Sequence, residues 1–537
     1  MKILLIVPRY NLTDKKNYNY TFPLGLAYIA SVIQKAGYDI DCLNLNHLDG
    51  NVEDLVNIAL SEKKYDVVCS GHIGIGHNAI KKIISACKLH KTSPKVITGG
   101  PLITSEPKLM FKSLNPDFGV IGEGEVTILE LIKSLEMKKQ VGDVNGIIYW
   151  NNKKEMVITP PRKGIDNIDS LPFPNFDLLG FSEYLDNQDS TGSPYSLFDF
   201  PRPLPILCSR GCPFQCTFCY HSLGTKYRSR SVDNIIKEIK YSINKYKINF
   251  LFIYDDLFAI NKERLYDFCK KIKKVFKEVP WECKWCCQLS VQKVDDKLLT
   301  TLKEAGCGAI SYGFESYSPI VLKSMKKPIT PQQIDNAIKL TRKHRIITQG
   351  NFIFGDRAET KETARETLDY WKNNCDGQLQ LFFIQPYPGT EIYEHCIRKG
   401  VIKDKLDFVE NQMYNINWFN MTDSMTDKEI LELKKEILKL RVTHSKYIVP
   451  LNVKKDKINY SFEVKCPYCN NNLIYRNCKI DNLLYYILNI RCRKCSMTFF
   501  VVSSLYKLGM KYYHKLEFFR KTYLSIRDSI LKIQAKK

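Results

Sequence analysis

The sequence lacks long apolar runs. No stretch of its 537 residues approaches the roughly 18 to 20 consecutive apolar residues that a membrane-spanning helix needs. The first apolar segment, Ile3–Val7, is also far shorter than the apolar core of a signal peptide. We therefore expect a cytoplasmic protein in which this first segment is a buried strand.

Acidic residues are scarce relative to basic ones. The chain has 57 Asp and Glu against 80 Lys and Arg, so its formal net charge is +23. A strongly basic surface attracts phosphates, and a nucleic-acid-binding protein with a structural metal cluster is therefore the non-enzyme alternative. The lysines are spread along the whole chain, however, which favours a general compositional bias. Nucleic acid is not the partner that we expect.

The cysteines do not resemble the dense disulfide framework of a small secreted protein, because the chain is long and its 19 cysteines are dispersed. Seven of them fall into two groups with the spacing of metal ligands. The other twelve are expected to be reduced and mostly buried thiols: Cys42, Cys69, Cys87, Cys208, Cys269, Cys283, Cys286, Cys287, Cys307, Cys375, Cys396 and Cys478.

The first group, Cys212, Cys216 and Cys219, has the spacing C-x3-C-x2-C and no fourth cysteine within the motif. Four thiolates fill every corner of a [4Fe–4S] cube, so three leave one iron open to a substrate or cofactor. The alternative is a zinc knuckle, which prefers four ligands and would take Cys208 as the fourth. Because Cys208 lies at the end of the preceding strand, the iron–sulfur cluster is the favoured interpretation.

The second group comprises two C-x2-C knuckles, Cys466 with Cys469 and Cys492 with Cys495, separated by 22 residues. This spacing is slightly longer than that of a typical zinc ribbon. Four thiolates close a tetrahedral zinc site and supply the folding energy of a small module. A rubredoxin-type iron site or an auxiliary cluster is the alternative.

The length predicts two to four domains. Short apolar runs alternate with helical segments at the N-terminus, which predicts a doubly wound parallel sheet. The rhythm returns later as six strand–helix units, which suggest a partial TIM-like barrel with catalytic loops at the strand ends. The expected order is a first α/β domain, a proline-rich linker, the barrel, a helical segment, a zinc ribbon and a basic helical tail: residues 1–150, 151–200, 201–400, 401–455, 456–503 and 504–537.

Residues 1–400 resemble the cobalamin-binding radical SAM enzymes. The resemblance rests on the three-cysteine loop that follows the first barrel strand, and on four further motifs of the family: Pro23–Tyr28, Gly99–Pro101, Gly122–Glu125 and the proline-rich bridge Ile168–Pro174. It implies a flavodoxin-like first domain, a (β/α)6 radical SAM barrel, and three cofactors, namely a [4Fe–4S] cluster, S-adenosylmethionine (SAM) and cobalamin.

In this family the open iron chelates SAM, and reductive cleavage yields a 5′-deoxyadenosyl radical. The resemblance assigns SAM contacts to residues at the ends of barrel strands and in the cluster loop: Phe218, Asp256, Glu315 and Gly355. The run from Gly355 to Thr360 lacks the proline and the second glycine that the family usually has here. The conformation of that loop is therefore expected to differ.

The resemblance also assigns a cobalamin site to the loops after the strands of the first domain: Ser70, Gly71, Gly99, Gly100, Gly122 and Glu123. The D-x-H-x-x-G motif, whose histidine is the lower cobalt ligand in some corrinoid proteins, is missing. His47 imitates its end but follows the second strand, so we interpret it as a surface turn residue. His72 and His77 either face the corrin or are polar loop residues.

The function that we expect is cobalamin-dependent methylation of an unactivated carbon, on an unidentified small-molecule or lipid substrate, with an external low-potential electron donor. A radical rearrangement, an oxidative cyclisation or C–S bond formation on the same scaffold are the enzymatic alternatives.

The tail, Leu505–Lys537, carries nine Lys and Arg against two acids and interleaves them with aromatic residues. A basic amphipathic helix of this kind is typical of contact with an anionic membrane surface. The alternative is a helix packed on the ribbon module.

Overall fold

The computed structural model describes residues 1–9, 13–72, 76–192, 194–413 and 419–513. The chain forms two compact units. The first comprises residues 1–188, 202–375 and 379–440, and the second comprises 189–201, 376–378 and 441–537. Of the twelve cysteines outside the two ligand-like groups, eleven are buried and Cys42 is half-buried, which agrees with the predicted burial. Among the described residues, no helix has both the length and the apolar character needed to cross a membrane.

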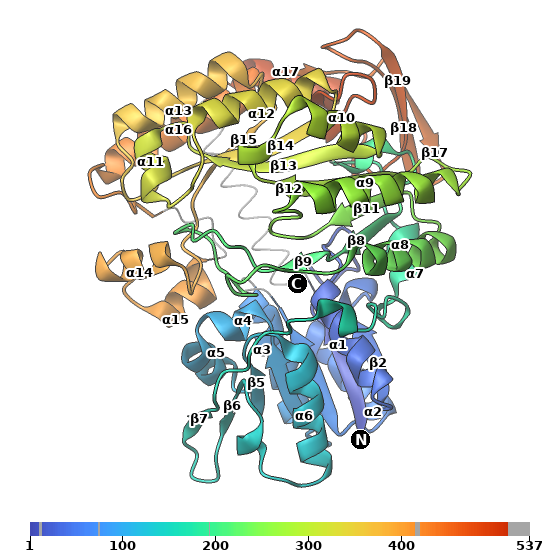
Figure 1. The fold of residues 1–537 in the computed structure, drawn as a ribbon, viewed down its shortest axis with the longest axis vertical. Coiled ribbons are helices and arrows are strands. Elements are labelled where there is room, and N and C mark those ends of the chain that lie inside the picture. Colours follow the sequence, from blue (N-terminus) through green and yellow to red (C-terminus); the bar gives the residue numbers. More distant parts are fainter. Residues whose placement is uncertain (10–12, 73–75, 193, 414–418, 514–537) are drawn as a thin grey trace. The chain divides into compact units, whose positions relative to one another are not determined.

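The first unit begins with a seven-stranded sheet in the order β2-β1-β3-β4-β5-β6-β7. Figure 1 draws this sheet in blue to teal, with β2, β5, β6 and β7 labelled. Its first five strands are parallel and follow the order of a flavodoxin-like doubly wound sheet. The strands are β1 (Lys2–Val7), β2 (Asp39–Asn44), β3 (Val67–Gly71), β4 (Lys95–Gly99), β5 (Phe118–Val120), β6 (Ile147–Trp150) and β7 (Met156–Ile158).

Alternation along strand β1 distributes its side chains to two apolar layers. Ile3, Leu5 and Val7 join one layer together with apolar residues of α1 and α6, whereas Leu4 and Ile6 join the other with residues of α2, α3 and α5. Both faces of the sheet are therefore covered by helices: α1 (Leu24–Lys35), α2 (Val52–Glu62), α3 (His77–Leu89), α4 (Pro101–Ser105), α5 (Pro107–Leu114) and α6 (Gly124–Glu136).

The predicted boundary at residue 150 is one strand early, because β7 pairs antiparallel with β6 at the edge of the first sheet. The stretch 151–200 is also not a free linker. Phe176, Phe181 and Tyr184 lie in one aromatic cluster with Phe22, and residues 189–201 belong to the second unit. Apolar side chains spaced between the prolines therefore join this segment to the large apolar cluster of the first unit.

A six-stranded sheet in the order β15-β14-β13-β12-β11-β8 forms the rest of the first unit, and every neighbouring pair is parallel. The predicted alternation of strands and helices is confirmed here. The strands are β8 (Pro203–Ile206), β11 (Phe250–Ile253), β12 (Lys284–Leu289), β13 (Cys307–Glu315), β14 (Ile347–Phe354) and β15 (Gln380–Phe383).

Amphipathic helices precede, connect and follow these strands, and several begin with side-chain caps. Thr330, for example, forms a capping box with Gln333 at the start of α12. The helices are α7 (Phe181–Asp186), α8 (Val232–Tyr246), α9 (Lys262–Lys277), α10 (Asp296–Glu304), α11 (Pro319–Ser324), α12 (Pro331–Lys343), α13 (Lys361–Asn374), α14 (Glu391–Arg398), α15 (Lys405–Asp407) and α16 (Asp427–His444).

The second unit contains two three-stranded sheets around a small apolar core, with the orders β16-β21-β20 and β17-β18-β19. Its elements are β16 (Tyr447–Ile448), β17 (Asn452–Asp456), β18 (Asn459–Lys465), β19 (Asn472–Cys478), β20 (Ile487–Arg491), β21 (Thr498–Val502) and α17 (Ser504–Tyr513). The predicted basic tail begins in α17, and its residues 514–537 lie outside the described residues.

Candidate active site

The three-cysteine loop begins where the first strand of the second sheet ends. A two-residue ribbon, β9 (Ser209–Arg210) with β10 (Arg228–Ser229), closes residues 211–227 at their base. Gly211 has a φ of +81°, and a Cβ there would collide with the carbonyl oxygen of Lys226. Only glycine suits this position, so the chain turns sharply just before the first cysteine.

Cys212, Cys216 and Cys219 line one cavity of about 220 Å³. The hydrogen bond from the Cys219 thiol is the main reason that the pKa of Cys216 falls to about 7, and the same contact, together with burial, raises the pKa of Cys219. A thiolate is the form that binds a metal. Three sulfurs around one cavity fit a [4Fe–4S] cube that has one open iron.

Cys208 is not among the residues that line this cavity. Its residue is 0% exposed, and burial raises the pKa of its thiol. Its backbone N–H donates to the Asp255 carboxylate at 2.7 Å, and its carbonyl accepts from the Arg264 guanidinium at 3.1 Å. Cys208 therefore supports the base of the loop and is placed away from the three sulfurs.

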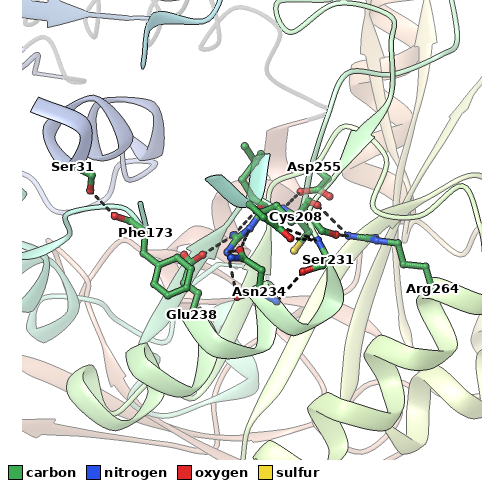
Figure 2. A network of polar contacts seen from close by, with 11 residues as sticks. Ser31, Phe173, Cys208, Ser231, Asn234, Glu238, Asp255 and Arg264 are labelled. Carbon is green, nitrogen blue, oxygen red and sulfur yellow. Dashed lines mark hydrogen bonds and ion pairs between the residues drawn. The ribbon is translucent and has the colours of Figure 1, made fainter. Parts of the chain in front are cut away.

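The two adjacent aspartates that follow β11 have different surroundings. Asp256 lines the cavity, and burial raises the pKa of its carboxyl group. Asp255 is fully buried and accepts hydrogen bonds from Cys208 and, at 2.6 Å, from the Ser209 hydroxyl (Figure 2). Burial raises its pKa to about 7. Asp256, which the sequence predicted as a SAM contact, is therefore the aspartate that lines the cavity.

The polar network in Figure 2 continues from Cys208 into α8. Arg230 pairs with Glu238 at 2.5 Å, and both side chains are almost fully buried. Arg230 also donates from its backbone to the Cys208 carbonyl at 3.0 Å and from its guanidinium to the Leu207 carbonyl at 2.9 Å. These contacts satisfy the backbone at the carboxyl end of β8, which is otherwise left without sheet partners. The network holds the base of the cluster loop.

An ion pair stands in the wall of the cavity. The Lys327 ammonium donates to the Glu315 carboxylate at 2.9 Å, and both residues line the cavity. Burial alone would lower the pKa of Lys327, but the negative charges of Glu315 and Cys216 outweigh it and raise that pKa. A Cβ at Gly313 would collide with both charged groups, so glycine makes room for the pair.

Glu315, predicted as a SAM contact, thus reaches the cavity at the end of β13, where its φ is +61°. A left-handed φ in a residue other than glycine is uncommon and accompanies functional sites. Lys327 was missed by sequence reasoning. One lysine in a lysine-rich chain carries no pattern, and only the folding of residues 316–326 brings it back to the strand end.

The other two predicted SAM contacts do not line the cavity. Phe218 is half-buried and packs against the apolar layer that includes Leu4 and Ile6. Gly355 donates its N–H to the Glu359 carboxylate at 2.5 Å, and burial raises the pKa of Glu359 to about 8. Glu359 thereby shapes the loop that lacks the usual proline and second glycine.

The glycines predicted for the cobalamin site gather at the carboxyl edge of the first sheet. Gly71 ends β3 and pairs with Gly99 at the end of β4; a Cβ on Gly71 would lie 3.0 Å from the Gly99 carbonyl oxygen. Gly100 has a φ of +83°, and a Cβ there would lie 3.0 Å from the His72 carbonyl oxygen. Glycine at positions 71 and 100 therefore lets the backbone segments at this edge pack closely against each other, at the strand ends where open α/β sheets bind their ligands.

Further polar residues stand at the same edge. The Ser70 hydroxyl donates to the Ile6 carbonyl at 2.8 Å, within the sheet. Gly122 has a φ of +81° and donates its N–H to the Thr104 hydroxyl at 3.0 Å. Among the described residues, the buried Thr98 hydroxyl has no hydrogen-bond partner. An orphaned polar group beside the glycines also fits a ligand at this edge.

Glu123, the last predicted cobalamin contact, is held by the barrel. Its carboxylate pairs with Arg228 at 2.6 Å and accepts the Ile165 N–H, also at 2.6 Å. Burial alone would raise the pKa of Glu123, but these hydrogen bonds outweigh it and lower that pKa. The carboxylate is therefore engaged with protein groups.

The histidines of the first domain are mostly buried. The interpretation of His47 as a surface turn residue is wrong: its side chain is 7% exposed, contacts the Tyr20 hydroxyl at 2.8 Å and pairs with Glu183 at 3.2 Å. His77 is 0% exposed and contacts the Ser113 hydroxyl at 2.9 Å. His72 is buried beside the glycine edge. Helix packing across 136 residues, which no local pattern reveals, encloses His47.

The second cysteine group comes together in the second unit. The four sulfurs all lie within 4.8 Å of one another. Cys466 and Cys495 are 3.7 Å apart, and Cys469 and Cys492 are 3.6 Å apart. A tetrahedron with Zn–S bonds of about 2.3 Å has sulfur–sulfur edges of about 3.8 Å. The spacing of the sulfurs therefore suits a tetrahedral metal ion.

Hydrogen bonds reach two of these sulfurs, those of Cys469 and Cys492. Burial alone would raise the pKa of Cys469, but hydrogen bonds from the backbone and side chain of Asn471 outweigh it, and the pKa falls to about 6. The N–H groups of Lys494 and Cys495 approach the Cys492 sulfur, both at 3.4 Å. At Cys466 and Cys495, by contrast, burial raises the pKa of the thiol.

Family comparison agrees with this arrangement. The radical SAM superfamily model matches residues 206–370, and the B12 binding domain model matches residues 15–132. An uncharacterized methyltransferase of Pyrococcus horikoshii, PH0819, is 33% identical over 411 residues, which are 75% of this chain and 84% of the relative.

A second relative and one solved structure are also similar to this chain. A cytidylyl-2-hydroxyethylphosphonate methyltransferase of Streptomyces wedmorensis is 27% identical over 80% of this chain and 88% of its own length. The fold is similar to that of the radical SAM methyltransferase TsrM of Kitasatospora setae, with a TM-score of 0.60 over 75% of this chain and 76% of that one, at 18% identity. The three-cysteine cavity, the two parallel sheets and these relatives lead to one assignment: the chain belongs to the radical SAM enzymes that carry a B12-binding domain.

Proposed function

We propose that this protein is a cobalamin-dependent methyltransferase that places a methyl group on an unactivated carbon of its substrate. The observation that carries the proposal is the cavity in which Cys212, Cys216 and Cys219 meet Asp256 and the Glu315–Lys327 pair, in the same compact unit as the glycine edge of the first sheet. When bound, the cluster supplies one electron for SAM cleavage, and the corrin supplies methyl transfer.

The side chains of the cavity suit the polar groups of SAM. The three thiolates would hold the cluster, and the Lys327 ammonium suits the carboxylate of SAM. Glu315 and Asp256 are acceptors for its amino group and ribose hydroxyls. The glycines at residues 71, 99 and 100 would hold cobalamin through the backbone. Six parallel strands with the cysteine loop at a carboxyl end support a partial (β/α)6 barrel.

The test is an anaerobic incubation of cluster-reconstituted protein with SAM, cobalamin and a low-potential reductant. Methyl transfer predicts both S-adenosylhomocysteine and 5′-deoxyadenosine, and a corrin absorption that stays with the protein after gel filtration. Deoxyadenosine alone would favour a rearrangement or cyclisation. Absence of corrin absorption after reconstitution would overturn the proposal.

Two cysteine variants make that test specific. Cys216→Ala removes one of the three thiols of the cavity and is expected to abolish SAM cleavage, because a cube held by two cysteines loses a second corner. Cys208→Ala removes a buried thiol outside the cavity and is the matched control, so its cluster content and SAM cleavage should be retained. Cleavage that persists in Cys216→Ala would contradict the cluster assignment.

We also propose that the second unit is a zinc ribbon closed by Cys466, Cys469, Cys492 and Cys495. The sulfur distances and the lowered pKa of Cys469 support this. A closed four-thiolate site has no open position for chemistry, so the ribbon would be structural.

A membrane surface is the partner that we propose for this unit. The loop of residues 479–486 lies against α17, where the rings of Tyr485 and Tyr506 are 5.0 Å apart. Leu484 on that loop is 72% exposed, and Leu508 on α17 is 52% exposed. Exposed apolar side chains next to a basic segment suit the boundary of an anionic bilayer.

A further inference from the structure

The cluster loop is anchored to the B12-binding domain by charged side chains at both of its ends. Arg210 ends strand β9, two residues before Cys212, and Arg228 begins strand β10, where the loop returns. The partners of both arginines, Glu123 and Glu125, stand at the start of α6 in the first domain. All four charged side chains are at most 7% exposed.

Arg210 is enclosed by groups of the first domain. Its guanidinium donates to Glu125 at 2.5 Å and lies 3.6 Å from Glu123. On another side it lies 5.4 Å from the centre of the Tyr28 ring, on α1. Tyr28 and the two glutamates belong to the Pro23–Tyr28 and Gly122–Glu125 motifs. These family-like motifs therefore meet at the residue that leads into the cluster cysteines.

Arg228 links the same acidic group to the inside of the loop. One of its nitrogens lies 2.6 Å from the Glu123 carboxylate, and another donates to the Ile165 carbonyl at 2.8 Å. It also donates to the carbonyl of Leu223, within the cluster loop, at 2.9 Å. Phe173 provides a second connection between α1 and the residues after the cluster loop. Ser31 of α1 donates to the Phe173 carbonyl at 2.5 Å (Figure 2). Arg230 lies 5.6 Å from the centre of the Phe173 ring.

Stability alone is a weak explanation for these pairs. Desolvation of two charges often equals or exceeds their attraction, so apolar residues of the same volume would hold the two parts together as well. What buried ion pairs with forked arginine geometry add is a defined relative position. Reaction between two cofactors depends on such a position, because an error of about 1 Å can slow a reaction about a hundredfold.

We propose that Arg210 and Arg228 are positioning residues: through Glu125 and Glu123 they set the place of the cluster loop relative to the B12-binding domain. This inference rests on the proposed function, since only a reaction that uses both cofactors needs that placement. It also reassigns Glu123, which acts on the cluster loop and not as a cobalamin contact.

The experiment compares Glu125→Gln with Glu130→Gln. Both residues are on α6, and both pair with an arginine, but Glu130 pairs with Arg162 at the surface, where its side chain is 47% exposed. S-adenosylhomocysteine is the product of methyl transfer from SAM. One-electron cleavage of SAM instead gives methionine and a 5′-deoxyadenosyl radical, which becomes 5′-deoxyadenosine when it takes a hydrogen atom from the substrate carbon. The ratio of S-adenosylhomocysteine to 5′-deoxyadenosine therefore reports the placement of the cluster loop separately from radical formation.

For Glu125→Gln we expect full iron content and deoxyadenosine formation within about twofold of wild type. The ratio of S-adenosylhomocysteine to 5′-deoxyadenosine should be at least about tenfold lower than in wild type. Arg210→Lys keeps the charge but loses the forked geometry, and should shift the ratio in the same direction. Glu130→Gln should match wild type. A wild-type ratio in Glu125→Gln, or a parallel loss of iron and of both products, would overturn the proposal.

Hydrogen exchange on the cofactor-free protein supplies an independent readout. Glu125→Gln should reduce amide protection in the β9–β10 ribbon, while Glu130→Gln leaves it unchanged. Unchanged protection in Glu125→Gln would contradict the anchoring itself. If wild type forms no S-adenosylhomocysteine, the methyltransferase function fails, and the exchange result still decides whether the ion pairs hold the loop.

Discussion

At the scale of single residues, neighbours in the sequence take opposite roles. Asp255 accepts hydrogen bonds at the base of the cluster loop, whereas Asp256 lines the cavity. Both follow β11, and the alternation of side chains along an extended chain separates them. The choice between them could be made from sequence only because Asp256 matches a family position. The hydrogen bonds that Asp255 accepts come from Cys208 and Ser209, which lie 47 and 46 residues earlier in the chain.

Asp255 predicts a pH dependence of stability. Burial raises the pKa of Asp255 to about 7, although the hydrogen bonds from Ser209 and Cys208 act to lower it. In the unfolded chain the pKa of this group lies near 3.9. The native state therefore keeps a proton that the unfolded state releases. Stability from this group is complete below about pH 4 and is lost as the pH rises through 7.

Urea titrations of cofactor-free wild type and Asp255→Asn at pH 5 and pH 8 check this. Between these pH values, the wild type should lose about 2 to 3 kcal/mol of unfolding free energy relative to the variant, which cannot titrate at this position. Parallel pH profiles of the two proteins would show that the carboxyl group does not titrate in this window.

At the scale of secondary-structure elements, the strand ends carry the function. The carboxyl ends of β8, β11, β12 and β13 supply most of the cavity, and those of β3, β4 and β5 supply the glycine edge. The hairpin of β6 and β7 was not predicted, because its strands are short and lie next to the proline-rich segment. In the second unit, the knuckles between strands bring four cysteines together, which their spacing alone predicted.

The ribbon predicts a metal-dependent fold of the second unit. Cys469→Ala should lose the bound zinc, about one ion per chain in wild type, and strands β17 to β21 should lose amide protection, because metal binding supplies the folding energy of such modules. Metal analysis by mass spectrometry and hydrogen exchange measure both effects.

Cys478→Ala is the matched control for this prediction. Cys478 is buried in the same module but is not one of the four clustered sulfurs; it contacts the Ser190 hydroxyl at 3.1 Å. Its zinc content should equal that of wild type. Iron in place of zinc would identify a rubredoxin-type site, and zinc retained by Cys469→Ala would disprove the ligand set.

At the scale of the whole molecule, the net charge of +23 makes contact with anionic surfaces favourable. Exposed apolar residues add a local component on the second unit, at Leu484 and Leu508. Each basic residue near an anionic membrane contributes about 1 kcal/mol, and salt screens this attraction. Charge and apolar surface together predict binding that depends on lipid headgroup and on ionic strength.

Co-sedimentation with lipid vesicles tests this prediction. The protein should pellet with vesicles that contain phosphatidylserine, and much less with pure phosphatidylcholine or at high salt. A Leu484→Ser/Leu508→Ser variant should bind several-fold more weakly, whereas Leu431→Ser, which changes a comparably exposed leucine on α16, should bind like wild type. Equal pelleting with neutral and anionic vesicles would disprove the membrane interpretation.

The sequence by itself determined the features that are local along the chain. The spacing of Cys212, Cys216 and Cys219 predicted the cluster loop, two C-x2-C knuckles predicted the metal site, and alternating apolar runs predicted the two parallel sheets. Each cysteine motif and each apolar run is a short local pattern, whose spacing indicates the kind of structure it forms.

Only the tertiary structure decided the contacts between distant segments. Arg210 meets Glu125 across 85 residues and Arg228 meets Glu123 across 105, and Lys327 reaches the cavity wall with no motif of its own. His47 is buried by a helix that lies far along the chain. The partner of a buried charge is selected by packing and desolvation in three dimensions, and spacing along the chain does not encode it.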